Sequence, residues 1–288
     1  MPPAVFVVGH GTKSEAGQAE LAKTVASLRE VLTDRKVGYG YLELAHPTIE
    51  EGLSNLIDEH VSSVTMVPLV LLGAGHAKSD IAGAVEMARI AYPKVQFFYG
   101  GDLGVTPELL EAFYLQGASQ SPAMMSASVA SPTGILLVGR GASDPDANSD
   151  LYKIGRLLQE FYAISLLECS FISIARPSVP EGLDRLYRLG ARHIAVMPYF
   201  LFPGALPDRI WSQAREWSAS HQDTGMDLLG PLGAHAVLVQ LMRRQIREAE
   251  AGEVHMSCDL CIYRQRVPGY ESYAGRPITV AFPADHHH

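Results

Sequence analysis

The most informative part of the sequence is Val5-Phe6-Val7-Val8-Gly9-His10-Gly11, which has the pattern of a buried strand that ends in a glycine-bounded turn. Its end returns 130 residues later as Val138-Gly139-Arg140-Gly141. Two further pairs of segments repeat at the same spacing: Ala45-His46-Pro47-Thr48 matches Ala175-Arg176-Pro177-Ser178, and Val67-Pro68-Leu69 matches Met197-Pro198-Tyr199. Agreement at several sites with one spacing indicates an internal duplication.

Apolar runs alternate with helical patterns along the first copy of the repeat. We expect strands near Val5–Val8, Tyr39–Leu44, Val64–Leu72 and Val95–Tyr99, with helices over Gln18–Leu32, Ile49–His60 and Ile81–Ala91. Strands rich in Val and Leu that lack polar alternation are typical of parallel sheets with helices on both faces. The sequence therefore predicts an α/β fold made of two homologous, doubly wound parallel-sheet halves.

The repeat also predicts how the chain is divided. We expect one half over residues 1–120 and a second over 134–250, joined by the Ser/Ala-rich stretch Gly117–Thr133 and followed by a tail at 251–288. Two such sheets facing each other leave a cleft at the carboxyl ends of their strands, where doubly wound folds bind ligands. The final His286-His287-His288 is typical of a purification tag and carries no functional prediction.

Composition narrows the class of partner. A formal charge of -8 and the absence of Lys/Arg runs argue against nucleic acid or an anionic membrane surface, since both require a basic face. The first residues lack the pattern of a signal peptide, and the apolar stretch Val64–Leu72 is too short to span a bilayer. We therefore expect a cytoplasmic protein with a small-molecule partner.

Differences between the two halves point to chemistry, since packing alone should keep matched positions alike. Four positions differ in this way: His10 matches Arg140, Glu43 matches Ser173, His76 matches Leu206 and His46 matches Arg176. His10, Glu43 and His76 each follow a strand of the first half, so these three should lie at one edge of its sheet. Two imidazoles and a carboxylate suit a divalent transition metal and can also accept protons from a ligand.

Each of these residues also has an interpretation without chemistry. Gly9-His10-Gly11 is compatible with a phosphate loop or a plain turn, because short glycine motifs are weakly specific. His76 could be a solvated loop histidine, and Glu43 a polar residue at a strand end. The expected convergence of all three on one sheet edge favours the metal site.

The segments Val8–Gly11, Val67–His76 and Lys78–Ile81 resemble the sirohydrochlorin cobaltochelatase family, also called CbiX, and its sirohydrochlorin ferrochelatase relatives. The resemblance covers essentially the whole chain, and the doubled length resembles the long form, in which one polypeptide holds both halves. It implies ATP-independent insertion of Co2+ into sirohydrochlorin in cobalamin synthesis. The alternatives are Fe2+ insertion in sirohaem synthesis, Ni2+ insertion, or a non-catalytic carrier of tetrapyrrole or metal.

The resemblance also implies roles for particular residues. It assigns metal binding to His10 and His76, and metal binding or pyrrole deprotonation to Glu43, with one active site per chain. Sirohydrochlorin carries eight carboxylates, which an acidic protein must meet with locally placed cations. The candidates for substrate binding are Arg140, Arg176 and Arg209, each of which could instead be a solvated arginine, and His46, which could simply line the cleft.

The tail contains Met256-Ser257-Cys258-Asp259-Leu260-Cys261, an M-x-C-x-x-C pattern that resembles the tail of long-form cobaltochelatases, where it is associated with an iron-sulfur cluster. Two cysteines cannot complete a four-thiolate site, so a cluster on Cys258 and Cys261 would require two chains and predicts a homodimer bridged at the tail. Zinc, a redox dithiol or a bare pair are the alternatives. The third cysteine, Cys169, falls in an apolar run and is expected to be buried.

Overall fold

The computed structural model describes residues 3–57, 60–73, 75–125 and 133–254, without the side chains of 75–79 and 125. The first repeat contains β1 (Pro3–Gly9), α1 (Glu15–Val31), β2 (Lys36–Tyr41), α2 (Ile49–Leu56), β3 (Ser63–Pro68), α3 (Gly75–Ala91), β4 (Gln96–Tyr99) and α4 (Pro107–Gln120). A short 3-10 helix, η1 (Pro122–Met125), follows it. The second repeat contains β5 (Thr133–Gly139), α5 (Pro145–Tyr162), β6 (Leu166–Phe171), α6 (Val179–Arg188), β7 (His193–Pro198), α7 (Ala205–Ala219), β8 (Gly225–Leu228) and α8 (Ala236–Ala251).

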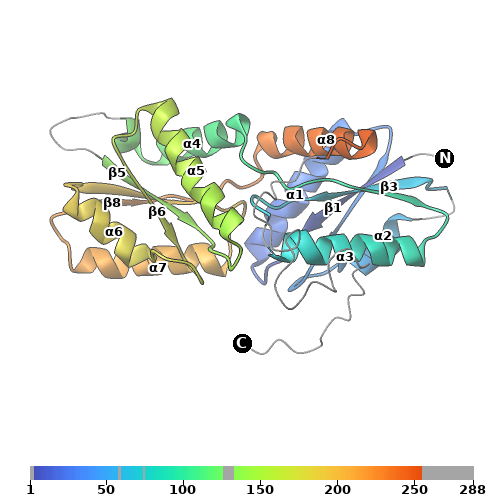
Figure 1. Cartoon of the computed structure of the whole chain (residues 1–288), viewed down its shortest axis with the longest axis horizontal. Helices are drawn as coiled ribbons and strands as arrows, with labels where there is room; N and C mark the ends of the chain where they lie inside the picture. The colour runs from blue at the N-terminus through green and yellow to red at the C-terminus, as the bar shows by residue number, and fades with distance from the viewer. Residues whose placement is uncertain (1–2, 58–59, 74, 126–132, 255–288) are drawn as a thin grey trace, which may run out of the picture.

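The strands form two parallel sheets with the same topology, in the orders β2-β1-β3-β4 and β6-β5-β7-β8. In the first sheet Val5 lies opposite Val37 and Thr65, and in the second Ile135 lies opposite Leu167 and Ala195. Helices cover both faces of each sheet (Figure 1). The predicted α/β class with two duplicated, doubly wound halves is thereby confirmed.

Two strands end earlier than the apolar pattern indicates. The second strand stops at Tyr41 rather than Leu44, and the third stops at Pro68 rather than Leu72. Beyond the strand, Leu69 N donates to Val8 O at 2.8 Å, and Leu103 N and Gly104 N donate to Val70 O and Leu71 O at 2.9 and 3.0 Å. The segment after Pro68 is therefore a loop held by backbone hydrogen bonds. The apolar residues that follow line the cleft instead, which is why hydrophobicity alone extended the strands too far. The second helix likewise ends at Leu56, before the expected His60.

Matched capping boxes begin the second helix of each half. The backbone N–H of Thr48 donates to the carboxylate of Glu51 at 2.8 Å, and the backbone N–H of Glu51 donates to the Thr48 hydroxyl at 3.2 Å. Ser178 and Glu181 form the equivalent box in the second half. These contacts satisfy N–H groups that a helix start leaves without partners, and they fix where the loop after the second strand must turn.

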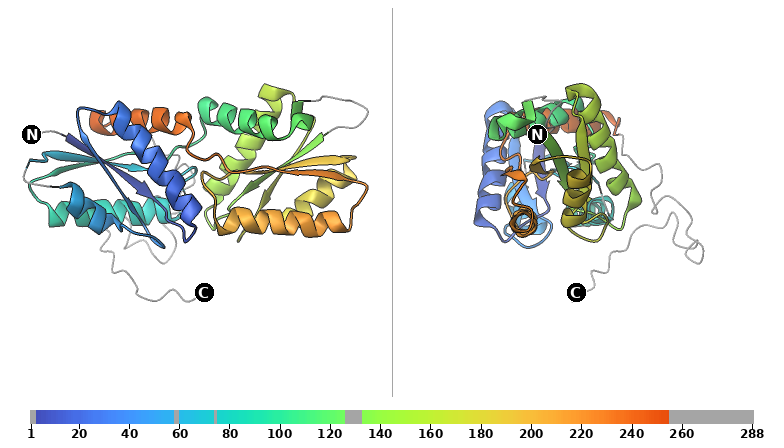
Figure 2. Two further views of the ribbon diagram at one scale, coloured as in Figure 1. Left: turned by 180° about the vertical axis from the view of Figure 1, so that it is seen from behind. Right: turned by 90° about the vertical axis from the view of Figure 1, so that its left-hand side faces the viewer.

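The last helix of each repeat covers the sheet of the other repeat (Figures 1 and 2). From α8, Gln245 Nε2 donates to Pro68 O at 3.2 Å and to Gly101 O at 2.6 Å, both in the first repeat. From α4, Phe113 packs on Tyr199 of the second repeat with ring centroids 4.3 Å apart. We therefore call β1–β4 with α1–α3 and α8 the first lobe, and β5–β8 with α4–α7 the second lobe. The division of the sequence at 1–120 and 134–250 stays a prediction. Each lobe differs from its sequence repeat by this one helix.

The exchanged helices tie the two lobes into one core. A single hydrophobic cluster contains Val5 and Leu28 of the first lobe, Ile135 and Leu158 of the second, and Leu241 of α8. The outer face of each sheet has a separate cluster beneath its own helices. The lobes are thus joined through one face of each sheet, whereas the loops at the carboxyl ends of β1 and β5 meet across the cleft. In the described part of the chain, every helix falls short of the length and apolarity that a bilayer crossing requires.

Candidate active site

The loop after β1 places His10 beside the loop after β2. Gly11 has φ +102, and a Cβ there would lie 1.7 Å from the carbonyl oxygen of Glu43, so only glycine fits this close approach. The backbone N–H of Glu43 donates to His10 O at 3.0 Å. The sequence pattern Gly-His-Gly thus has a local structural reason, because the second glycine lets the two loops touch.

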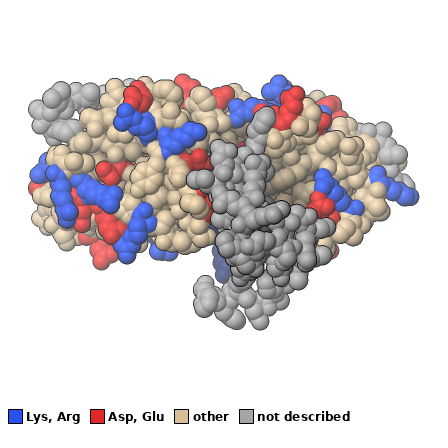
Figure 3. Space-filling view, in the orientation of Figure 1, with Lys and Arg blue, Asp and Glu red and all other residues tan. Residues whose placement is uncertain are grey.

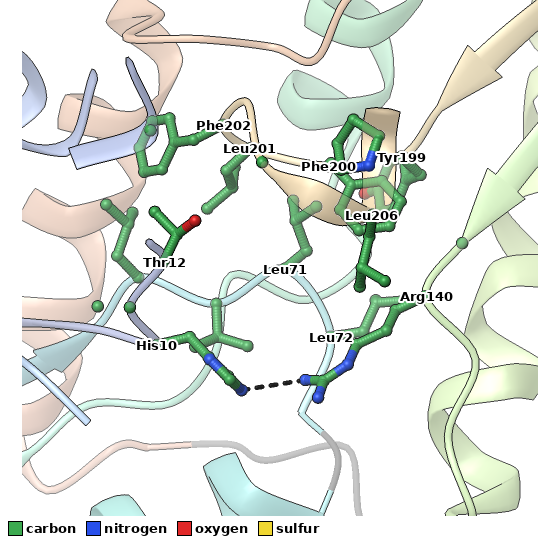
Figure 4. A pocket seen from close by; sticks show the side chains of 18 of the residues that line it. His10, Thr12, Leu71, Leu72, Arg140, Tyr199, Phe200, Leu201, Phe202 and Leu206 are labelled. Atoms are coloured by element: carbon green, nitrogen blue, oxygen red, sulfur yellow. Dashed lines mark hydrogen bonds between the residues drawn. The ribbon is translucent and has the colours of Figure 1, made fainter. Parts of the chain in front are cut away.

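The His10 imidazole contacts one charged group on each nitrogen. Its Nδ1 lies 3.5 Å from Glu43 Oε1, and its Nε2 lies 3.1 Å from Arg140 Nη1 of the second lobe (Figure 4). A guanidinium can only donate hydrogen bonds, so Nε2 is the acceptor in this contact. In the neutral ring the proton then lies on Nδ1, facing the carboxylate of Glu43.

Two of the three residues predicted to form the metal site are therefore brought together. The third, His76, is the second residue of α3, which begins after β3 at the same sheet edge as His10. Its side chain lies outside the described residues. The assignment of metal binding to His10, Glu43 and His76 stays a prediction, and the geometry of the first two is compatible with it.

A cavity of about 490 Å³ lies between the two lobes. His10, Glu43 and Arg140 line it together with apolar residues from both lobes. We call the second-lobe part the aromatic wall, which consists of Tyr199, Phe200, Leu201, Phe202 and Leu206 (Figure 4). The first-lobe side adds the polar His10 and Glu43 to apolar residues such as Leu71 and Leu72. A mainly apolar cavity with a few polar groups suits a flat macrocycle, since the ring faces lose water while the polar centre can meet those groups.

Sequence reasoning missed the aromatic wall, although a signal for it was present. At the matched positions of the first half stand Leu69, Val70, Leu71 and Leu72, so three of four positions change from aliphatic to aromatic in the second half. The Tyr199 hydroxyl is buried and has no hydrogen-bond partner among the described residues. Burial raises the pKa of Tyr199 far above its ordinary range, and it raises the pKa of Tyr41, on the opposite lobe, to about 12. Both phenols therefore stay protonated in the cavity lining.

Of the four residues predicted to bind substrate, the structure places Arg140 in the cavity lining, with Lys13 as a further cation that sequence reasoning missed. On the face shown in Figure 3, described Lys and Arg side chains are interspersed with Asp and Glu. Among the described residues that line the cavity, Arg140 and Lys13 are the Lys and Arg side chains available to the carboxylates of an anionic ligand.

The other three lie elsewhere. His46 Nδ1 lies 2.9 Å from Glu51, and Arg176 Nη1 lies 2.6 Å from Glu181, so the two halves build the same contact at the same place. The Arg176 hydrogen bond is the largest cause that lowers the pKa of Glu181 to about 2. Arg209 Nη2 donates to Ile172 O at 3.2 Å. A role of His46, Arg176 and Arg209 toward substrate stays a prediction.

The cysteines fall into two groups. Cys258 and Cys261, with the predicted iron-sulfur site and the dimer that it would bridge, lie outside the described residues. Cys169 is 4% exposed, as the sequence predicts, and burial raises the pKa of its thiol to about 12. A thiol that stays protonated is a poor nucleophile and a poor metal ligand, so Cys169 is a packing residue.

Two duplicated parallel sheets, joined by exchanged helices and separated by a cleft at their strand ends, define a chelatase-like α/β protein. The family model CbiX matches residues 4–117 and 134–249, and the chain belongs to this family. A sirohydrochlorin cobaltochelatase of Priestia megaterium is 34% identical over 268 residues, covering 90% of this chain and 84% of that protein. A sirohydrochlorin ferrochelatase of the same organism is 30% identical, covering 85% of this chain and 89% of its own. The structure of SirB from Bacillus subtilis with Fe3+ matches with a TM-score of 0.72 at 26% identity, over 88% of this chain and 97% of that one.

Proposed function

We propose that this chain inserts Co2+ into sirohydrochlorin without ATP, at a site formed by His10, Glu43 and His76 in the first lobe. The observation that carries the proposal is the His10–Glu43 pair facing the aromatic wall across one cavity. Relatives named as sirohydrochlorin cobaltochelatase and sirohydrochlorin ferrochelatase match most of the chain, which supports the same substrate here. Membership of the CbiX family supports the reaction class.

The residues fit the two demands of metal insertion. Two pyrrole N–H bonds must break, with each electron pair forming a bond to the metal and each proton passing to a base. Glu43, whose side chain is 47% exposed, can accept such a proton and release it to water, and His10 can hold the ion near the ring centre. The aromatic wall holds the macrocycle flat from the other side. Because Ser173 and Leu206 stand opposite Glu43 and His76 in the repeat, one site per chain is expected.

Cobalt is the proposed metal because the cobaltochelatase relative has the higher identity over the larger share of this chain. Imidazole and carboxylate ligands accept Co2+, Fe2+ and Ni2+ alike, so the rate of insertion decides between them. The test mixes the chain with sirohydrochlorin and each metal under anaerobic conditions and follows product absorbance against a protein-free control. We expect the greatest acceleration with Co2+.

A matched set of variants separates catalysis from binding. His10→Ala and His76→Ala should each abolish turnover, whereas Arg140→Ala should mainly weaken binding of sirohydrochlorin. A larger acceleration with Fe2+ or Ni2+ would move the assignment to that metal. Tetrapyrrole binding without acceleration by any metal would make the chain a carrier and would contradict the enzyme.

A further inference from the structure

Arg140 occupies the nitrogen of His10 that a metal would need. Its Nη1 lies 3.1 Å from His10 Nε2, while Glu43 faces the other ring nitrogen. A metal–imidazole bond is roughly 2.0–2.1 Å long and uses the nitrogen lone pair that accepts the arginine N–H. The guanidinium and the ion therefore compete for one lone pair, and their like charges repel.

The second-lobe loop is fixed, so this competition can be relieved only by the side chain. Gly141 has φ +82, and a Cβ there would lie 2.0 Å from Ser173 O. The backbone N–H of Ser173 donates to Arg140 O at 2.9 Å, which holds the loop as the matching bond holds His10. The Arg140 side chain itself is exposed, and it can swing without disturbing the core.

Arg140 also lacks a carboxylate partner among the described residues. The neighbouring loop of the second lobe has Ser173 where the first lobe has Glu43. In the described part of the chain, the guanidinium is instead hydrogen-bonded to the His10 imidazole, which accepts through the lone pair of Nε2. A guanidinium bonds more strongly to a carboxylate than to a neutral acceptor, particularly through two parallel hydrogen bonds. A ligand carboxylate that enters the cavity should therefore draw Arg140 away from His10.

We infer that Arg140 couples the two substrates: it holds His10 Nε2 until a carboxylate of the tetrapyrrole takes the guanidinium, which frees the nitrogen for the metal. The inference rests on the proposed function, in which the ligand is a polycarboxylate tetrapyrrole. It makes Arg140 a positioning residue that acts on metal binding through His10. It predicts that metal binds weakly to the free protein and tightly once the macrocycle is seated.

The first test measures Co2+ binding to the whole chain without tetrapyrrole, by titration calorimetry and by the visible absorption of bound Co2+. Arg140→Ala should tighten Co2+ binding by at least about fivefold, the lower end of usual couplings between sites. Arg140→Gln keeps a hydrogen-bond donor but loses the charge, so its Co2+ affinity should lie between those of Arg140→Ala and the wild type. Arg188→Ala removes an exposed arginine outside the cavity and should leave Co2+ affinity unchanged.

A double-mutant cycle shows whether the effect passes through His10. In a His10→Ala background, Arg140→Ala should give clearly less gain in Co2+ affinity than in the wild type. Unchanged or weaker Co2+ binding in Arg140→Ala, or an equal gain without His10, would overturn the inference. These readouts need no turnover, so they stay informative if the chain proves not to insert metal. If it does, Arg140→Ala should lower the KM for metal while raising the KM for tetrapyrrole.

Discussion

The loops after β1 and β5 have the same backbone arrangement but present different side chains to the cleft. In each, a glycine with positive φ lets the loop touch the one beside it, and the next loop donates a backbone hydrogen bond of 3.0 Å to His10 O or 2.9 Å to Arg140 O. The first loop presents an imidazole beside a carboxylate, and the second presents a guanidinium beside a hydroxyl. The frame was thus kept after duplication while the side chains facing the cleft diverged.

In the loops after β2 and β6, by contrast, the residues differ between the halves but the contacts are the same. His46 with Glu51 and Arg176 with Glu181 differ in residue type but form the same contact around the same capping box. A difference between the halves therefore indicates chemistry only where the contact differs as well as the residue. By that criterion the difference between His10 and Arg140 indicates chemistry, whereas His46 and Arg176 both contact the glutamate of the capping box.

The largest effect is expected when one lobe receives the residue of the other at the matched position. His10→Arg should lower metal insertion by at least about 100-fold, since even changes to residues that merely support a metal ligand cost roughly 10- to 100-fold. The fold should survive, because the side chain is partly exposed and its loop is held by backbone contacts. The measurement is the initial rate of product absorbance, with circular dichroism to check folding.

The reciprocal change supplies the control. Arg140→His should not create a second metal site, because Ser173 and Leu206 provide neither a carboxylate nor an imidazole. The stoichiometry of bound Co2+ should therefore stay the same. Near-normal turnover in His10→Arg, or a second equivalent of metal in Arg140→His, would show that the lobes are not divided in this way.

The exchanged helices allow a second comparison. Phe113→Ala in α4 and Leu241→Ala in α8 each remove a nearly buried side chain from the shared cluster, and each should lower the free energy of unfolding by about 3 kcal/mol. Both tryptophans, Trp211 and Trp217, lie in α7, so their fluorescence reports the second lobe alone. Denaturant unfolding followed by fluorescence and by circular dichroism should nevertheless give coincident transitions in both variants.

A substitution at the surface serves as the control for the two buried variants. Leu189→Ala, at a position 58% exposed, should change stability by less than about 0.5 kcal/mol. If Leu241→Ala shifts the circular dichroism transition and leaves the tryptophan transition in place, the lobes unfold separately and the shared core does not couple them.

The sequence predicted the sheets because an apolar run without polar alternation, present in both halves, is typical of a buried parallel strand. It could not predict the helix exchange, since the apolar face of α8 shows that the helix is covered and not which sheet covers it. The ends of β2 and β3 were misplaced because Leu44 and Leu69–Leu72 remain apolar where they line the cavity rather than the sheet.

For the site, strand topology predicted that His10 and Glu43 would meet, because both follow neighbouring parallel strands. The contact of Arg140 with His10 depends on how the two lobes face each other, which no local pattern specifies. The exposed contacts of His46 and Arg176 were also beyond prediction, since the sequence shows the residues and not the glutamates that they turn toward.

A smaller effect tests the hydroxyl of Tyr199, which the aliphatic counterpart Leu69 in the first half lacks. Tyr199→Phe removes a buried hydroxyl without a partner among the described residues and keeps the ring on Phe113, so stability should rise by about 1 kcal/mol. The measurement is denaturant unfolding of the variant beside the wild type. A fall in stability of that size would mean that the hydroxyl forms a bond in the folded protein, and the wall would then have a polar anchor as well as apolar contacts.

The smallest effect concerns the two capping boxes under acid. Glu181 has its pKa lowered from 4.5 to about 2 by Arg176, so its contribution is complete above about pH 4.5 and is lost as the pH falls toward 2. Glu181→Gln should therefore lower stability at neutral pH and lose that difference near pH 2. Glu51→Gln should show the same sign, with the pKa of Glu51 lowered by His46, but a smaller effect, because an imidazole is not always charged as a guanidinium is. Acid unfolding followed by circular dichroism measures both. Equal penalties for the two variants at neutral pH would show that the backbone caps, which the halves share, stabilise these turns more than the paired charges in which the halves differ.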